Sequence, residues 1–76
     1  HRTDLRVAAD TAVQLAEGVV VGPDVCVFDV LKPRPRIMPA TAVRLAIEHA
    51  YSTRNYDLNE KAALYAEAKV PELWVL

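Results

Sequence analysis

The segment from residue 44 to residue 76, RLAIEHAYSTRNYDLNEKAALYAEAKVPELWVL, constrains the fold more than any other part of the chain. It predicts a strand, a polar turn, a helix and a second strand. The helix has the sharpest signal, because Asp57 is a good N-cap and Glu60, three residues later, can complete a capping box. Val70-Pro71 ends the helix, since proline cannot continue it and restrains the preceding residue.

One charged residue falls within the apolar face of this helix. At about 100° per residue, that face consists of Leu58, Ala62, Leu64, Tyr65 and Ala68. Lys61 lies inside the same arc, between Leu64 and Tyr65. A lysine is almost never fully buried unless it is paired. Lys61 therefore either has an acidic partner or reaches water from the edge of the helix, and the pattern leaves both alternatives open.

The rest of the chain predicts short strands. Residues 5–8 (LRVA) predict the first, and residues 11–16 favour a second, although a helix is also possible there. The run from residue 19 to 30 is the most strand-like in the chain, and Gly22-Pro23 interrupts it at a bulge or at the boundary between two strands. Residues 41–50 predict a further buried strand.

Length and charge limit the class of protein. With 76 residues, 53% of them hydrophobic and 25% charged, the chain is one small globular domain or part of one. A net charge of -1 gives no bulk electrostatic sign of a nucleic-acid or membrane partner. The single cysteine, Cys26, excludes an internal disulfide and fits a reducing compartment. Without a signal-peptide pattern or a membrane-spanning run, we expect a cytoplasmic protein with no membrane partner.

Two acidic residues interrupt otherwise apolar strands. Asp24 shares one strand face with Cys26 and Phe28, and its carboxylate can cap a neighbouring backbone amide. Glu48 shares a face with Arg44, Ala46 and Ala50, opposite Val43, Leu45, Ile47 and His49. A glutamate in a buried strand is costly unless its charge is compensated. A bound cation would compensate it, and so would an ion pair with Arg44 or Lys61.

Asp24, Glu48 and Lys61 together carry the groups that metal-dependent phosphodiester hydrolysis needs. Oxygen ligands from Asp24 and Glu48 suit a hard cation such as Mg²⁺ (or Mn²⁺), which keeps several waters and also takes phosphate oxygens. Such a cation polarises the phosphate and lowers the pKa of an attacking water. A lysine ammonium can position that water or offset charge on the phosphoryl oxygens. Spacing alone does not distinguish this site from a structural ion pair.

Several short motifs at these residues resemble a known family. They are PDV at 23–25, AIE at 46–48, STR at 52–54, YDL at 56–58, EK at 60–61, LY at 64–65 and VPELWV at 70–75. Over residues 19–76 they resemble the Uma-type putative restriction endonucleases, which belong to the PD-(D/E)xK nuclease superfamily. The resemblance implies an α/β fold (an α+β mixed sheet flanked by helices) with a restriction-endonuclease-like core, and a DNA substrate. It also implies that Asp24 and Glu48 bind the divalent cation and that Lys61 completes the catalytic set.

The chain departs from the family pattern in three respects. The superfamily's lysine normally lies two residues after the acid, where this chain has Ala50, so Lys61 is the candidate for a lysine relocated to the helix. His49 and Ala50-Tyr51 replace a valine and a Leu-Ser-Pro run. The chain is also shorter than the family's domain, so we expect residues 1–76 to form a single partial domain, incomplete at the N-terminus. An alternative function is therefore a truncated, catalytically inactive nuclease-fold module that acts in assembly or binding.

Some further expectations concern the surface. A sheet without its leading strands and helices would expose edges and an apolar face, which predicts a homodimer or a higher homo-oligomer. His49 is expected at the edge of the core, and Cys26 as a small buried hydrophobe. Residues 31–40 (LKPRPRIMPA) predict a surface loop. Its basic residues could contact phosphates, although such charges are more often simply solvated: Lys32, Arg34 and Arg36.

Overall fold

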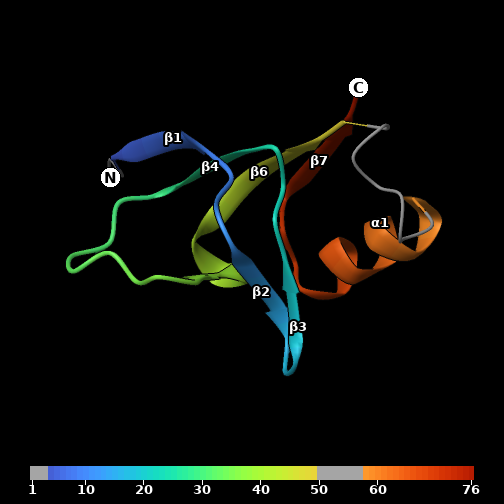
Figure 1. Cartoon of the computed structure of the whole chain (residues 1–76), viewed down its shortest axis with the longest axis horizontal. Coiled ribbons are helices and arrows are strands. Elements are labelled where there is room, and N and C mark those ends of the chain that lie inside the picture. The colour runs from blue at the N-terminus through green and yellow to red at the C-terminus, as the bar shows by residue number, and fades with distance from the viewer. Residues whose placement is uncertain (1–3, 50–57) are drawn as a thin grey trace.

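The computed structural model of the chain describes residues 4–49 and 58–76. Its elements follow in the order β1 (Leu5–Ala9), β2 (Val13–Ala16), β3 (Val19–Val21), β4 (Val25–Asp29), β5 (Met38–Pro39), the short 3₁₀ helix η1 (Ala40–Ala42), β6 (Val43–Glu48), α1 (Leu58–Glu67) and β7 (Glu72–Val75). The predicted mixed α/β class is confirmed (Figure 1). No helix within the described ranges has the length and apolar character to cross a membrane.

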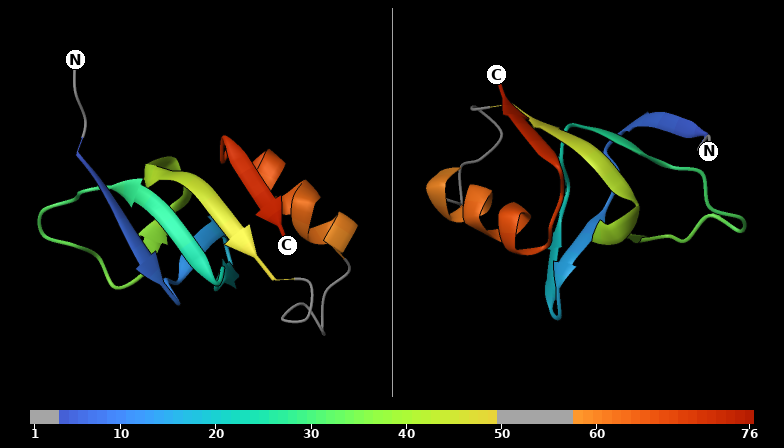
Figure 2. Two further views of the ribbon diagram at one scale, coloured as in Figure 1. Left: turned by 90° about the horizontal axis from the view of Figure 1, so that it is seen from above. Right: turned by 180° about the vertical axis from the view of Figure 1, so that it is seen from behind.

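The larger sheet has four strands in the order β1-β4-β6-β7. β4 is antiparallel to both β1 and β6, whereas β7 runs parallel to β6. Parallel neighbours need a crossover connection, and α1 lies between β6 and β7 in the chain. Figure 2 shows these four strands side by side, with α1 next to β7. The mixed character expected for the sheet is confirmed.

A second, smaller sheet packs against the first. Its order is β3-β2-β5, with β2 antiparallel to β3 and parallel to β5. The expectation of a single mixed sheet flanked by helices is therefore only partly correct, because the described residues form two mixed sheets and one helix. The strand preferred for residues 11–16 is confirmed as β2, and Gly22-Pro23 marks the boundary between β3 and β4.

The surface loop predicted for residues 31–40 ends earlier than expected. Met38 pairs with Val13 across β5 and β2, and its side chain is only 1% exposed. Ala40–Ala42 then forms η1, so the strand predicted from residue 41 begins only at Val43. A two-residue strand is too short to show a periodic pattern, so no local signal in the sequence indicates β5.

A bulge in β6 corrects the predicted faces of this strand. Val27 pairs with Leu45 and Phe28 with Val43, so Arg44 is the extra residue. As a result Val43 is buried on the same side as Ala46 and Glu48, contrary to the strict alternation expected from the sequence. The exposed Arg44 instead donates through Nε to Asp29 Oδ1 at 3.0 Å.

The helix α1 ends close to the predicted place. Lys69 has a φ of 65°, and the backbone N–H of Val70 donates to the carbonyl of Tyr65 at 3.1 Å. A left-handed residue of this kind commonly terminates a helix. Ala62 is exposed, contrary to the predicted apolar face, because α1 lies beside the sheet and only a narrow stripe reaches the core. The N-cap predicted at Asp57 and the side chain of Leu58 lie outside the described residues.

The hydrophobic core lies between the two sheets and α1. Its buried members are Val13, Leu15, Val21, Cys26, Phe28, Met38, Ala42, Val43, Ala46, Tyr65 and Val70. The opposite face of the larger sheet carries apolar residues in aligned rows, and one row runs from Val7 through Val27 to Leu45. Val7 is 65% exposed and Trp74, in the neighbouring row, is 49% exposed.

Self-association through this exposed face stays a prediction. Burial of its apolar rows in a homodimer would remove hydrophobic surface from water. Light scattering at micromolar concentration is expected to give at least twice the monomer mass of 8.4 kDa. A stable monomer under these conditions would contradict the expectation.

Candidate active site

Glu48 is the centre of the candidate site. It is the last residue of β6, and it is 1% exposed on the side of the sheet that carries Ala46. Its backbone carbonyl accepts a hydrogen bond of 2.9 Å from the N–H of Leu76, just after β7. The strand is thus held on both sides, and the carboxylate is fixed inside the molecule. A buried carboxylate is unfavourable unless other groups compensate its charge.

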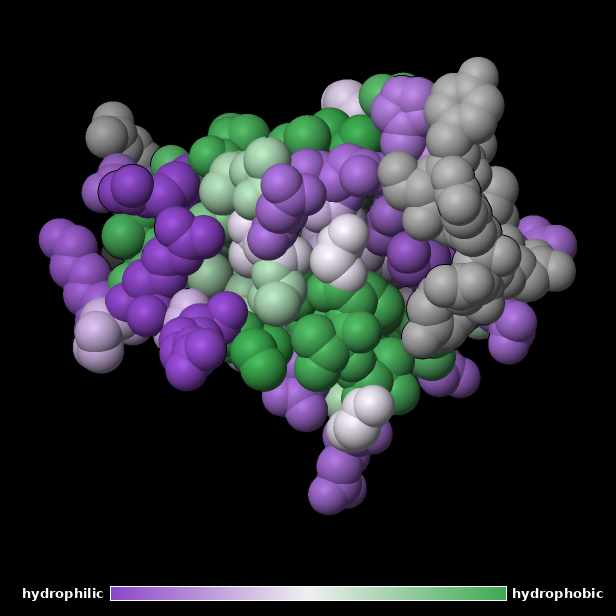
Figure 3. Space-filling model, viewed as in Figure 1, coloured by the Kyte–Doolittle hydropathy of each residue, from purple (hydrophilic) through white to green (hydrophobic). Residues whose placement is uncertain are grey.

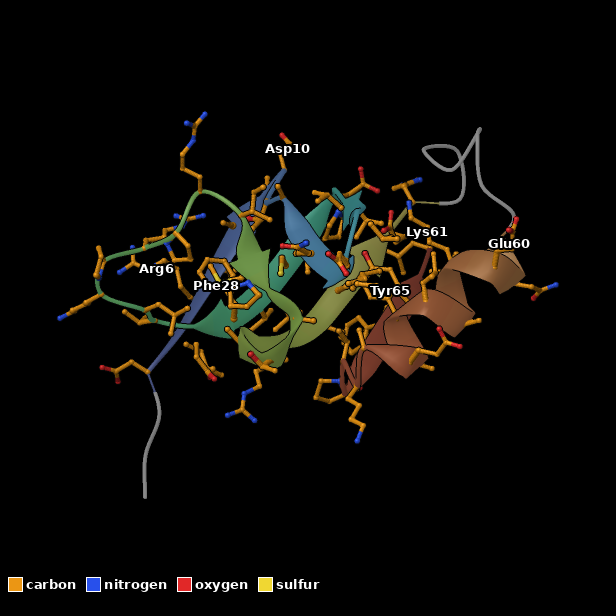
Figure 4. The ribbon with its side chains drawn as sticks, turned by 90° about the horizontal axis from the view of Figure 1, so that it is seen from below. Arg6, Asp10, Phe28, Glu60, Lys61 and Tyr65 are labelled. Atoms are coloured by element: carbon orange, nitrogen blue, oxygen red, sulfur yellow. The ribbon has the colours of Figure 1, made fainter. Side chains whose placement is uncertain are left out.

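Two side chains of α1 stabilise this carboxylate, one by its charge and one by a hydrogen bond. Lys61 Nζ lies 3.2 Å from Glu48 Oε2, and the hydroxyl of Tyr65 donates to the same oxygen at 2.8 Å. Residues four apart lie one above the other on a helix, so both donors reach the carboxylate from one face of α1. Figure 4 shows Lys61 and Tyr65 together on the inner side of the helix. The sequence left open whether Lys61 has an acidic partner or reaches water. In the structure it forms a buried ion pair with Glu48.

Tyr65 stays a neutral hydrogen-bond donor. Burial raises the pKa of its phenol well above the usual value, and the hydrogen bond to Glu48 raises the pKa further. The sequence placed Tyr65 only among the apolar residues of the helix and missed its polar role. Its position four residues after Lys61, on the same face, is the signal that could have identified it.

Asp24 immediately precedes the neighbouring strand β4, at the same end of the sheet. Val25 pairs with Ile47, so one further step along the register brings Asp24 opposite Glu48. The backbone N–H of His49 donates to Asp24 Oδ2 at 2.6 Å. The predicted capping of a neighbouring amide by Asp24 is therefore confirmed. Glu48 and Lys61 thus form an ion pair between β6 and α1, and Asp24 precedes β4 at the same end of the larger sheet.

The donor set fits a hard divalent cation. Mg²⁺ is usually bound through one or two carboxylates, with waters and substrate phosphates as its other ligands. Asp24 and Glu48 supply two carboxylates, and within residues 4–49 and 58–76 no group of three or more His, Cys, Asp or Glu is placed to hold a metal. A carboxylate has about four acceptor positions, and the contacts from Lys61 and Tyr65 to Glu48 use only part of that capacity.

Other candidates have smaller roles than the sequence allowed. His49 is exposed, so its predicted place at the edge of the core is wrong, because the strand ends at Glu48. Cys26 is fully buried, as predicted, and burial raises the pKa of its thiol to about 11. Residues 50–57, which include the STR motif at 52–54 and the predicted N-cap Asp57, lie outside the described residues.

The fold and this site define a small mixed α/β protein with a buried lysine–glutamate pair at the end of a sheet and an aspartate just before the neighbouring strand. Comparison with protein families matches residues 1–76 to the Uma2 family, described as putative restriction endonuclease. The chain belongs to this family, which implies a restriction-endonuclease-like fold and a hydrolase acting on DNA. A search of curated proteins and a search of solved structures returned no match.

Proposed function

We propose that this protein is a metal-dependent endonuclease that hydrolyses phosphodiester bonds in DNA by the PD-(D/E)xK type of chemistry. The observation that carries the proposal is the buried Lys61–Glu48 pair, with Nζ 3.2 Å from Oε2, at the same end of the sheet as Asp24. Membership of the Uma2 family supports the same class of reaction. A buried ion pair is costly to desolvate, so a role in stability alone is a weak explanation for it.

Asp24 and Glu48 would hold Mg²⁺ or Mn²⁺ between the ends of β4 and β6. When bound, the cation would polarise the phosphate and lower the pKa of the attacking water. Glu48 holds the ammonium of Lys61 in place. From there the ammonium can position the water or stabilise charge that develops on the phosphoryl oxygens.

Tyr65 and His49 act as positioning residues in this proposal. The phenol of Tyr65 donates to Glu48 Oε2 and so fixes the orientation of the carboxylate. The backbone N–H of His49 does the same for Asp24 through Oδ2. Groups that orient metal ligands usually contribute about 10- to 100-fold to affinity or activity. Because its pKa is raised, Tyr65 remains a donor at neutral pH and does not serve as a general base.

Calorimetric titration with Mg²⁺ and Mn²⁺ tests the cation site. We expect saturable binding to the wild type, lost in both Asp24→Asn and Glu48→Gln, because each substitution removes a charged ligand. Asp29→Asn and Glu67→Gln are matched controls, since they make the same chemical changes at carboxylates outside the site. A folded wild type without saturable binding would refute the proposed activity and favour the catalytically inactive module.

A further inference from the structure

A second group of polar side chains lies away from Glu48. It surrounds a cavity of about 220 Å³ at the start of the loop that follows β4. We call this cavity the loop pocket, and its lining residues are Arg6, Phe28, Val30, Leu31, Lys32 and Arg34. In Figure 4, Arg6 and Phe28 lie toward one end of the molecule, and Lys61 and Tyr65 lie toward the other.

The sheet register explains how Arg6 reaches this pocket. Arg6 on β1 pairs directly with Phe28 on β4, so their side chains lie on the same face of the sheet. Arg34 approaches the same ring from the loop, with its guanidinium carbon 5.0 Å from the ring centroid of Phe28. A guanidinium over an aromatic face is held by a cation–π interaction. Phe28 is 1% exposed, so its ring supports the guanidinium of Arg34 and does not offer a surface for base stacking.

The lining of the loop pocket has an excess of positive charge. Arg6, Lys32 and Arg34 line it, and no carboxylate does so among the described residues. Two ion pairs within the described ranges involve other cations, namely Arg44 with Asp29 and Lys61 with Glu48. Figure 3 shows hydrophilic side chains gathered over this end of the molecule, in the region of the loop after β4. Like charges in one concave surface repel each other, and an anion bound between them offsets that repulsion.

We propose that the loop pocket binds a backbone phosphate of the DNA strand, as a second contact remote from Glu48. This rests on the proposed function for the choice of DNA as the source of the phosphate. Two guanidinium groups favour a phosphate, because each offers planar, paired N–H donors that match phosphate oxygens. The stacking of Arg34 on Phe28 positions one of these groups before the ligand arrives, which lowers the entropic cost of binding.

DNA binding at several salt concentrations tests the loop pocket. Fluorescence anisotropy of a labelled duplex would be measured without divalent cation, so that the DNA is not cut. The double variant Arg6→Gln/Lys32→Gln is expected to reduce the slope of log K against log salt by about one, because the pocket binds one phosphate and each neutralised phosphate adds close to one to that slope. The matched control is Arg36→Gln/Lys69→Gln, which removes the same charge at exposed residues outside the pocket lining. The control is expected to keep the wild-type slope.

Several outcomes would contradict the proposal that the loop pocket binds a DNA phosphate. One is a wild type that does not bind DNA. Another is an unchanged salt slope in a folded Arg6→Gln/Lys32→Gln protein. Equal reductions in both double variants would also overturn it, because they would show diffuse attraction without a site. The test does not depend on Asp24 or Glu48. A protein that binds DNA through this pocket but never cuts it would therefore refute only the proposed function.

Discussion

Replacement of Lys61 by methionine is expected to destabilise the fold by about 3–5 kcal/mol. Methionine keeps the apolar stem of the side chain but removes the ammonium group, so the 1% exposed carboxylate of Glu48 loses its countercharge. The hydrogen bond from Tyr65 remains but carries no charge. A small domain has about 5–15 kcal/mol of stability in total. Chemical denaturation is therefore expected to show a large fall in the midpoint for Lys61→Met.

A second substitution distinguishes destabilisation by the unpaired buried charge from destabilisation by lost packing. In Lys61→Met/Glu48→Gln the carboxylate is replaced by a neutral amide, which can still accept the hydrogen bond from Tyr65. We expect this double variant to recover most of the stability that Lys61→Met loses. Lys32→Met, at an exposed lysine, is the control and should change stability by no more than about 0.5 kcal/mol. Equal destabilisation in the single and double variants would contradict the interpretation of Lys61–Glu48 as a charge pair.

Cleavage of a DNA duplex in Mg²⁺ is expected to fall at least about a hundredfold in Glu48→Gln and in Asp24→Asn. Each variant removes a ligand of a cation whose stabilisation of the transition state amounts to several kcal/mol, and about 1.4 kcal/mol corresponds to a tenfold change in rate. Tyr65→Phe is expected to lower the rate by about tenfold, because it disturbs only the orientation of Glu48. Initial rates under single-turnover conditions measure these effects on the chemical step.

Controls make the cleavage experiment specific. Asp29→Asn and Glu67→Gln are expected to keep the wild-type rate, since neither carboxylate belongs to the site. Omission of the divalent cation should abolish cleavage by the wild type. Persistent cleavage in a purified Glu48→Gln protein would place the reaction elsewhere, and a wild type that cuts no DNA would favour the inactive module.

The order of elements could be predicted from the sequence because it depends on local patterns. The valine-rich strands, the Gly22-Pro23 boundary and the helix before Pro71 all have local signals, and all are confirmed. The bulge at Arg44 was missed, since it arises from the pairing of β6 with β4 and not from any residue preference. The second sheet was missed for a related reason, because β5 joins it through a parallel contact with a distant part of the chain.

The candidate site shows the same division between local and long-range information. Helical periodicity placed Lys61 on the inner face of α1 but could not show which acid it meets. Tyr65 was missed because an aromatic residue in an apolar arc ordinarily belongs to the core. The contribution of Arg6 to the loop pocket depends on its register with Phe28, which no local pattern reveals. The separation of Arg6 and Phe28 from Lys61 and Tyr65 is likewise a property of the folded chain.

Paramagnetic NMR with Mn²⁺ tests the central claim most directly, because the ion broadens signals only from nearby nuclei. The claim is that Asp24 and Glu48 bind a divalent cation beside Lys61. We expect substoichiometric Mn²⁺ to broaden the amide signals of residues around Asp24, His49 and Lys61 in the wild type, and not to do so in Glu48→Gln. Broadening centred elsewhere, or the same pattern in both proteins, would contradict the account.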